Sequence, residues 1–311
     1  MSFHPTTFNQ GFYEPDDNHK VWYCQSGNPD GIPVFMFHGG PGDLSRPRHL
    51  KYFDLTKFNV VQIDQRGAGQ STAKDVLKDN TTQHLLGDIE AIRKLLNIDK
   101  SLVKGGSWGS VMAMLYAQTY PEAVSHLFVR NVFLGDKKSS DWLFSPECQT
   151  FFPDLWQHVA LSLNELGLKE YDAAALYNFL KDGSLKEQQL VCKIIRDWES
   201  NTYPIEATME ISELSDMTEN ERQGVLIWLH YQSHHFFIEE NQVLNDAHRV
   251  QHIPTAIIHG RFDMICPPNQ AYTLHKALPQ STLEITQDSG HKMSTTAVQF
   301  AKQMILNLLD R

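Results

Sequence analysis

Short apolar runs alternate along the chain with longer segments in which apolar residues recur every three or four positions. Short runs bounded by Gly, Pro or polar residues are typical of buried strands, and the longer periodic segments predict amphipathic helices. The predicted strands are 32–37, 60–64, 102–104, 127–132, 255–259 and 283–286. Strands that alternate with helices predict an α/β protein with a mostly parallel central sheet flanked by helices. The segment 20–25, which precedes these runs, predicts an antiparallel edge strand.

The stretch 140–245 has a different pattern, because its apolar residues keep helical spacing and no run in it predicts a strand. Tryptophans are concentrated there, namely Trp142, Trp156, Trp198 and Trp228. Large aromatic side chains gathered in one region predict an apolar underside that covers another surface. We therefore expect an inserted helical cap over 140–245, and a core formed by 1–139 and 246–311.

The segment Gly105-Gly106-Ser107-Trp108-Gly109 follows a predicted strand and precedes a helical pattern. In that setting G-x-S-x-G holds a serine on a tight turn, with glycines where side chains would clash. The turn presents the hydroxyl at a helix N-terminus, where backbone N–H groups stabilise developing negative charge. The pattern also occurs by chance, but the flanking strand and helix favour Ser107 as a nucleophile.

A serine hydroxyl is a weak nucleophile, so the site needs a histidine base and an acid that orients it. In this arrangement the partners follow in the order serine, acid, histidine, each after a late strand. Asp263 follows the predicted strand 255–259, and His291 follows the last predicted strand. Of the fifteen histidines, only His291 lies beyond that strand with a candidate acid before it. Asp288 is the alternative acid, although it would share a loop with the histidine.

The segment His38-Gly39-Gly40-Pro41-Gly42 stands at the end of another predicted strand. A glycine-rich loop at this place can offer a backbone N–H to the oxyanion of an acyl-transfer reaction. We expect the N–H of Trp108, which directly follows the serine, to be the second donor. The alternative is a Gly-Pro turn without a catalytic part.

The segment 64–71, DQRGAGQS, also follows a predicted strand and contains G-x-G. It lacks the third glycine of a dinucleotide-binding loop and the G-K-[ST] of a P-loop. We expect it to brace the loops around the serine.

Composition narrows the possible partners. The 311 residues include 37 acidic and 27 basic side chains, a formal net charge of −10, which repels phosphate backbones and anionic lipid. No secretory signal or membrane-spanning run is recognisable, and the cysteines, histidines and acids lack metal-site spacing. We expect a cytoplasmic protein with four reduced cysteines, no metal, and no nucleic-acid or membrane partner.

Taken together, HGGPG, DQRGAGQS, GGSWGS, HGRFD and GHK resemble the proline iminopeptidase family of the α/β-hydrolase fold over nearly the whole chain. The resemblance implies Ser107, Asp263 and His291 as the catalytic triad. It also implies an oxyanion hole around Gly39, Gly40 and Trp108. The implied activity is release of an N-terminal residue, typically proline, from short peptides without a cofactor.

The cap resembles the family more patchily. Trp198-Glu199 looks like the segment whose glutamate binds the free amine of the substrate, although Glu199 also fits a solvated helix position. A second amine-binding glutamate of the family is matched by Trp228, and a pocket phenylalanine by Gln232. We expect Glu199, Phe133, Trp228 and Gln232 to bind the substrate, with weaker preference for proline.

The interpretation is therefore a serine hydrolase that cleaves a small peptide or amide carrying a free amine. An esterase, lactonase or amidase of the same fold is the first alternative, since fold and triad do not determine specificity. A sensor that keeps the pocket but turns nothing over is the second.

Overall fold

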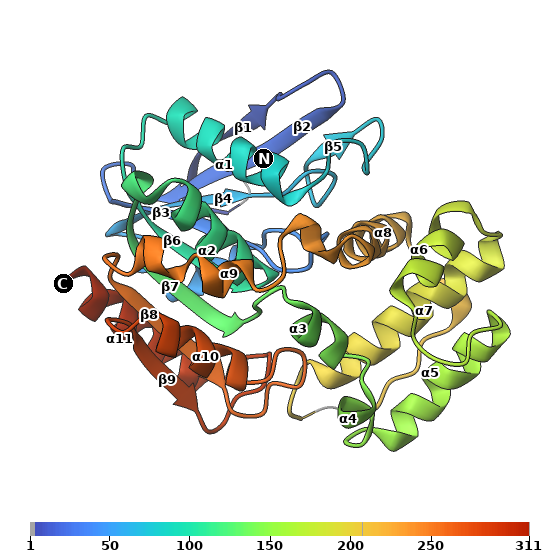
Figure 1. The fold of residues 1–311 in the computed structure, drawn as a ribbon. Helices are drawn as coiled ribbons and strands as arrows, with labels where there is room; N and C mark the ends of the chain where they lie inside the picture. The colour runs from blue at the N-terminus through green and yellow to red at the C-terminus, as the bar shows by residue number, and fades with distance from the viewer. Residues whose placement is uncertain (1–3, 207, 311) are drawn as a thin grey trace.

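The strands of the computed structural model, which describes residues 4–206 and 208–310, join in one sheet of order β1-β2-β4-β3-β6-β7-β8-β9, with β5 paired to β2 (Figure 1). Their bounds are β1 Thr7–Tyr13, β2 His19–Gly27, β3 Ile32–Phe37, β4 Phe58–Ile63, β5 Thr72–Ala73, β6 Ser101–Ser107, β7 Val124–Val132, β8 Thr255–Gly260 and β9 Thr282–Thr286. From β4 to β9 all neighbours are parallel, whereas β1, β2 and β5 pair antiparallel. The carboxyl ends of the parallel strands therefore meet at one edge of the sheet.

Each predicted buried strand overlaps a strand of the sheet, and the segment 20–25 lies in the antiparallel strand β2. The prediction that 20–25 forms the edge was wrong, because β1 pairs with the outer side of β2. The sequence of β1 does not indicate that it forms the edge strand. Its two phenylalanines, Phe8 and Phe12, are 41% and 49% exposed, so its apolar positions do not mark a buried face.

The two faces of the sheet are covered by different elements. Alternate residues of β3 point to opposite faces, as in any strand: Val34 and Met36 pack with α11 and the short 3-10 helix η1, Pro47–Tyr52. Phe35 and Phe37 pack with α1, α2 and α10 on the other face. These helices are α1 Thr82–Leu95, α2 Trp108–Thr119, α10 Asn269–Ala277 and α11 Thr295–Leu309.

A group of helices is inserted between β7 and β8 and stands beside the sheet in Figure 1. It comprises α3 Lys137–Trp142, α4 Pro146–Gln149, α5 Pro153–Glu165, α6 Ala173–Asp182, α7 Leu185–Thr202, α8 Glu219–Ser233 and α9 Gln242–Asn245. Helices α5 to α8 bury their own apolar cluster, in which Trp198 is fully buried. This insert supplies side chains to the edge where the parallel strands end.

Candidate active site

Ser107 is the last residue of β6 and the N-cap of α2, with φ 57° and ψ −131°. This left-handed backbone carries the chain from strand to helix in a single residue. The turn closes tightly, because a Cβ on Gly105 would lie 1.9 Å from the carbonyl oxygen of Gly109. Only glycine fits at position 105, so the local sequence dictates the turn that presents Ser107 at the N-terminus of α2.

Asp263 and His291 come together from the loops that follow β8 and β9. The imidazole Nδ1 of His291 lies 2.9 Å and 3.0 Å from the two carboxylate oxygens of Asp263. The alternative acid, Asp288, instead accepts hydrogen bonds from the hydroxyl groups of Ser289 and Ser294. The geometry therefore favours Asp263 as the residue that orients His291.

The carboxylate of Asp263 is fully buried and held by several donors. It accepts hydrogen bonds from the backbone N–H groups of Ile265 at 3.0 Å and Cys266 at 2.8 Å, and from the side-chain amide of Asn131 at 2.5 Å. His259 Nε2 lies 3.3 Å away. Burial opposes ionisation, but the charge of His291 and the hydrogen bonds from His259 and His291 outweigh it and hold the pKa of Asp263 well below its usual value.

Asn131 and His259 were not predicted as parts of the site. His259 lies four residues before Asp263, and its Nδ1 accepts from the backbone of Val132, so its Nε2–H points towards the carboxylate and the carbonyl of Cys266. The available signal was its place within HGRFD. The role of this histidine could not be predicted from that segment, because it depends on β7 lying beside β8 in the sheet.

The glycine-rich loop after β3 lies against the serine. A Cβ on Gly39 would stand 3.8 Å from Ser107 Oγ, and Gly40 has a left-handed φ of 103°. Trp108, the first residue of α2, is fully buried, and its backbone N–H belongs to the helix N-terminus. Gly39 and Gly40 therefore line the same cavity as Ser107, and Trp108 follows the serine directly, which are the places where an oxyanion hole is expected.

The segment 64–71 contacts this loop directly. The amide of Gln65 donates to the carbonyl of His38 at 3.1 Å and accepts from the indole N–H of Trp108 at 2.9 Å. Arg66 is anchored by Asp88 through two hydrogen bonds of 2.6 Å and 2.7 Å. The segment thus links the loop after β3 to the first residue of α2, as expected of a brace.

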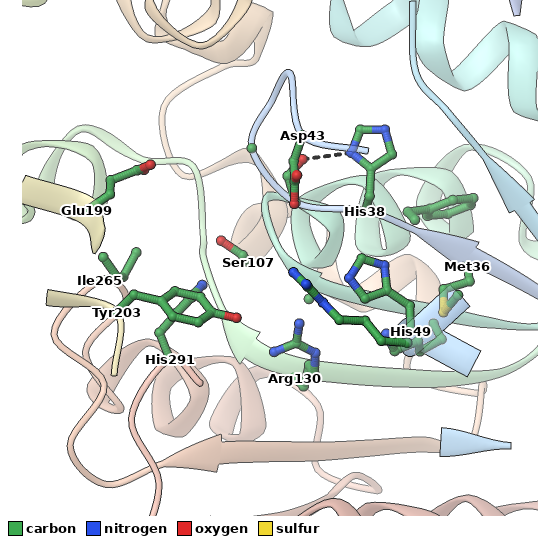
Figure 2. Close-up of a pocket in the computed structure, with 16 residues that line it drawn as sticks. Met36, His38, Asp43, His49, Ser107, Arg130, Glu199, Tyr203, Ile265 and His291 are labelled. Carbon is green, nitrogen blue, oxygen red and sulfur yellow. Dashed lines mark hydrogen bonds between the residues drawn. The ribbon is translucent and has the colours of Figure 1, made fainter. Parts of the chain in front are cut away.

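Two cavities meet at Ser107. The cap-side cavity is lined by Ser107 and all four residues predicted to bind substrate, namely Phe133, Glu199, Trp228 and Gln232. The sheet-side cavity also reaches Ser107, Glu199 and His291, and it is further lined by Lys104, Arg130, Arg48, His49 and Tyr203 (Figure 2). The residues of this second group were not predicted. Lys104 carried a signal, since it is a cation within an otherwise apolar strand.

Glu199 is held in place by the packing of the cap. Its neighbour Trp198 is fully buried and donates its indole N–H to the carbonyl of Leu143 at 2.5 Å. Burial raises the pKa of Glu199 to about 7, and the nearby Asp43 adds to the shift. Figure 2 shows the carboxylate projecting from the cap near Ser107. The side chain is therefore at the substrate cavity, not on a solvated helix face.

Comparison with known proteins agrees with this arrangement. Residues 32–296 match the alpha/beta hydrolase fold family. A protein of Leptolyngbya boryana named "Probable proline iminopeptidase" is 37% identical over 94% of this chain and 90% of its own length. The proline iminopeptidase of Arabidopsis thaliana is 34% identical over 94% of this chain and 77% of its own length. The chain belongs to the proline iminopeptidase family. It is thus a serine-type hydrolase of the α/β-hydrolase fold.

More distant solved structures share the fold alone. An α/β fold family hydrolase from Bacillus anthracis covers 98% of this chain and 99% of its own length with a TM-score of 0.63 and 16% identity. An esterase from Exiguobacterium antarcticum covers 96% and 99% with a TM-score of 0.62 and 18% identity. Among the described residues, no helix is both long and apolar enough to span a membrane.

Trp228 and Gln232, the two positions at which we expect this sequence to depart from the family pattern, both line the cap-side cavity. Gln232 accepts a hydrogen bond from the hydroxyl of Tyr171 at 2.5 Å, and its amide donates to Ser140 at 3.4 Å. Trp228 offers an aromatic ring and no negative charge. Glu199 is therefore the one carboxylate among the described residues that line this cavity.

Proposed function

We propose that this protein is an aminopeptidase that releases proline or another small or apolar N-terminal residue from short peptides through an acyl-enzyme. The observation that carries the proposal is Glu199, a carboxylate that lines both cavities beside Ser107. No other described residue forms a hydrogen bond or ion pair with that carboxylate, so it is free to receive an ammonium group. A carboxylate shielded from water binds one terminal positive charge strongly.

The hydrogen bonds between Asp263 and His291, and the cavity that Ser107 and His291 share, support a two-step acyl transfer. Ser107 Oγ attacks the scissile carbonyl carbon while His291 Nε2 takes its proton, and Asp263 holds the Nδ1–H of the imidazole. The oxyanion is stabilised by backbone N–H groups at Trp108 and the glycine-rich loop. The carbon–nitrogen bond then breaks, and His291 returns the proton to the leaving amine. Water, deprotonated by His291, hydrolyses the ester and restores the Ser107 hydroxyl.

The structural divide between cap and core supports the domain assignment made from sequence. We propose that 140–245 acts as a cap that selects the substrate, while 1–139 and 246–311 form the core that carries the triad. The side chains proposed to recognise substrate from the cap, Glu199, Trp228 and Gln232, come from α7 and α8. The four cysteines are free and buried, which fits a reducing, cytoplasmic setting.

Trp228 and Gln232 favour a second candidate function, a general esterase or amidase that needs no free amine. An aromatic ring and an amide at these positions bind apolar or neutral polar groups as readily as an amine. The shared triad would perform the same acyl transfer on an ester.

A panel of aminoacyl 4-nitroanilides and simple esters tests the proposal, with each anilide in free-amine and N-acetylated form. An aminopeptidase is expected to cleave the free forms and reject the acetylated ones, because acetylation removes the charge that Glu199 binds. Equal rates on both forms would instead identify the general esterase or amidase.

A further inference from the structure

Lys104 and Arg130 bring two cations to the floor of the sheet-side cavity. Lys104 lies on β6 and Arg130 on the neighbouring parallel strand β7. Both face the ring of Tyr52, with Lys104 Nζ 4.6 Å and Arg130 Cζ 5.9 Å from its centroid. Lys104 is only 3% exposed, so its amine lies inside the protein and not in solvent.

Within residues 4–206 and 208–310, neither cation forms an ion pair with a carboxylate. No carboxylate of the described residues lies within 4.0 Å of Lys104 or Arg130, or of Arg48 at the cavity rim. Arg130 donates one hydrogen bond of 3.0 Å to Asn131, and its buried Nε has no partner. A buried cation is normally paired, because desolvation without a counter-charge is costly. Lys104 and Arg130 therefore form a site at which an anion would be stabilised.

The other charged groups of the cavity do not supply that anion. Asp43 is paired with Arg46 at 2.6 Å, and Asp263 is engaged with His291. Glu199 stands at the cap end of the cavity, where burial raises its pKa to about 7.

The pKa values of His49 and Lys104 reflect the excess of positive charge in this part of the cavity. Burial, then the charges of Lys104 and Arg130, lowers the pKa of His49 to about 2. Burial and the nearby Arg130 and Lys51 likewise hold the pKa of Lys104 well below its usual value. An anion placed among these groups reverses the effect of the like charges.

The Arg130 side chain lies beside Gly106, the residue before the nucleophile. A Cβ on Gly106 would meet the Cγ and Nε of Arg130 at 2.8 Å, so the absence of a side chain there lets Arg130 lie across β6. Gly106 directly precedes Ser107. Both cations line the cavity that reaches Ser107. An extended residue spans about 3.5 Å, so a group one residue beyond the scissile bond lies within this cavity when the carbonyl is at Ser107.

We propose that Lys104 and Arg130 form a subsite for the free α-carboxylate of the leaving residue, so that the preferred substrates are dipeptides with both ends charged. This inference rests on the proposed aminopeptidase function. The amine of the substrate lies at Glu199, its carbonyl at Ser107, and its carboxylate at the cation pair. Arg130 offers the planar donors that suit a carboxylate, and Lys104 adds a point charge.

The test compares three substrates that share the best N-terminal residue X: X-Gly, X-Gly-NH2 and X-Glu-NH2. Wild type is expected to favour X-Gly over X-Gly-NH2 by about ten- to a hundred-fold in kcat/KM, the size of a charge-assisted hydrogen bond. X-Glu-NH2 carries its only carboxylate on the side chain, so high activity on it alone would reassign the subsite to acidic side chains and overturn the α-carboxylate proposal. A ratio near one between acid and amide overturns it without any variant.

Variants then locate the effect. Lys104→Met is expected to reduce the acid-over-amide ratio at least tenfold, and Lys104→Arg to retain it. Lys51→Met is the matched control, since Lys51 also faces the Tyr52 ring, at 5.5 Å, but is exposed and does not line the cavity. An unchanged ratio in folded Lys104→Met would contradict the proposal.

A binding measurement separates this proposal from the proposed function. If no free-amine peptide or anilide is cleaved, the aminopeptidase assignment fails, and calorimetry with N-acetylglycine and N-acetylglycinamide judges the subsite alone. Wild type is expected to bind the acid at least tenfold more tightly than the amide, and Lys104→Met to lose that difference. Equal binding of the two compounds by wild type overturns the anion subsite.

Discussion

The sheet edge and the cap build the site in different ways. At the sheet edge, Ser107, Asp263 and His291 each follow a parallel strand, and buried hydrogen bonds hold the acid and the histidine. In the cap, Glu199 and Trp228 lie on two packed helices and face the cavity without a comparable network. Strand ends hold reacting groups at short, constant distances, whereas helix faces vary the shape and charge of the pocket. The proposed acyl transfer thus belongs to the sheet edge, and the proposed recognition of the substrate amine belongs to the cap.

The largest effect is expected from a substitution at the sheet edge. Ser107→Ala is expected to lower kcat by at least about 10⁴-fold, because the variant lacks the hydroxyl proposed to form the acyl-enzyme. The fold should be unchanged, since only a hydroxyl at the cavity is removed. Steady-state kinetics and circular dichroism check both points, and labelling by a fluorophosphonate should be lost. Near wild-type hydrolysis by the folded variant would remove Ser107 from the mechanism.

The second effect compares two acids near His291. Asp263→Asn is expected to lower kcat by about 10⁴-fold, because the amide favours the wrong imidazole tautomer. Asp288→Asn is the matched control, since its partners are Ser289 and Ser294, and it should change the rate little. A reversed ranking of the two kcat values would transfer the role to Asp288.

The third effect tests the cap side alone. Glu199→Gln keeps the shape of the side chain but removes its charge, and kcat/KM for a free-amine anilide is expected to fall about ten- to a hundred-fold. Hydrolysis of an N-acetylated anilide or a simple ester should be unaffected, because these substrates carry no ammonium group. Equal losses on all substrates would mean that Glu199 supports the fold or the triad and does not recognise the amine.

The smallest expected effect is a pH dependence of kcat/KM that arises from Glu199 in the cap. Because the pKa of Glu199 is raised to about 7, its carboxylate is charged above that pH and becomes neutral as the pH falls. Between pH 8 and pH 6, kcat/KM for a free-amine anilide is expected to fall about tenfold more than for an ester without an amine. Glu199→Gln should abolish the difference between the two profiles. Parallel profiles in wild type would argue against an ionised Glu199 in amine binding.

The fold and the triad positions could be predicted because their signals are local. A buried strand, a glycine-bounded serine and an acid or histidine just after a strand are readable in short segments. Ser107, Asp263 and His291 lie where those segments placed them. The segment 20–25 was wrongly placed at the sheet edge because the pairing of strands is not a local signal. Its neighbour β1 exposes Phe8 and Phe12, and pairing with it is decided by hydrogen bonds between distant segments.

The sequence by itself determined the class of fold, and it predicted the order of the reacting residues and the two departures at Trp228 and Gln232. Only the tertiary structure decided which polar side chains share a cavity. Lys104 and Arg130 are 26 positions apart in the printed sequence and meet because β6 and β7 are adjacent and Gly106 leaves room between them. Burial changes the charge state of a group through its three-dimensional surroundings, so neither the raised pKa of Glu199 nor the unpaired cations could be read from residue order.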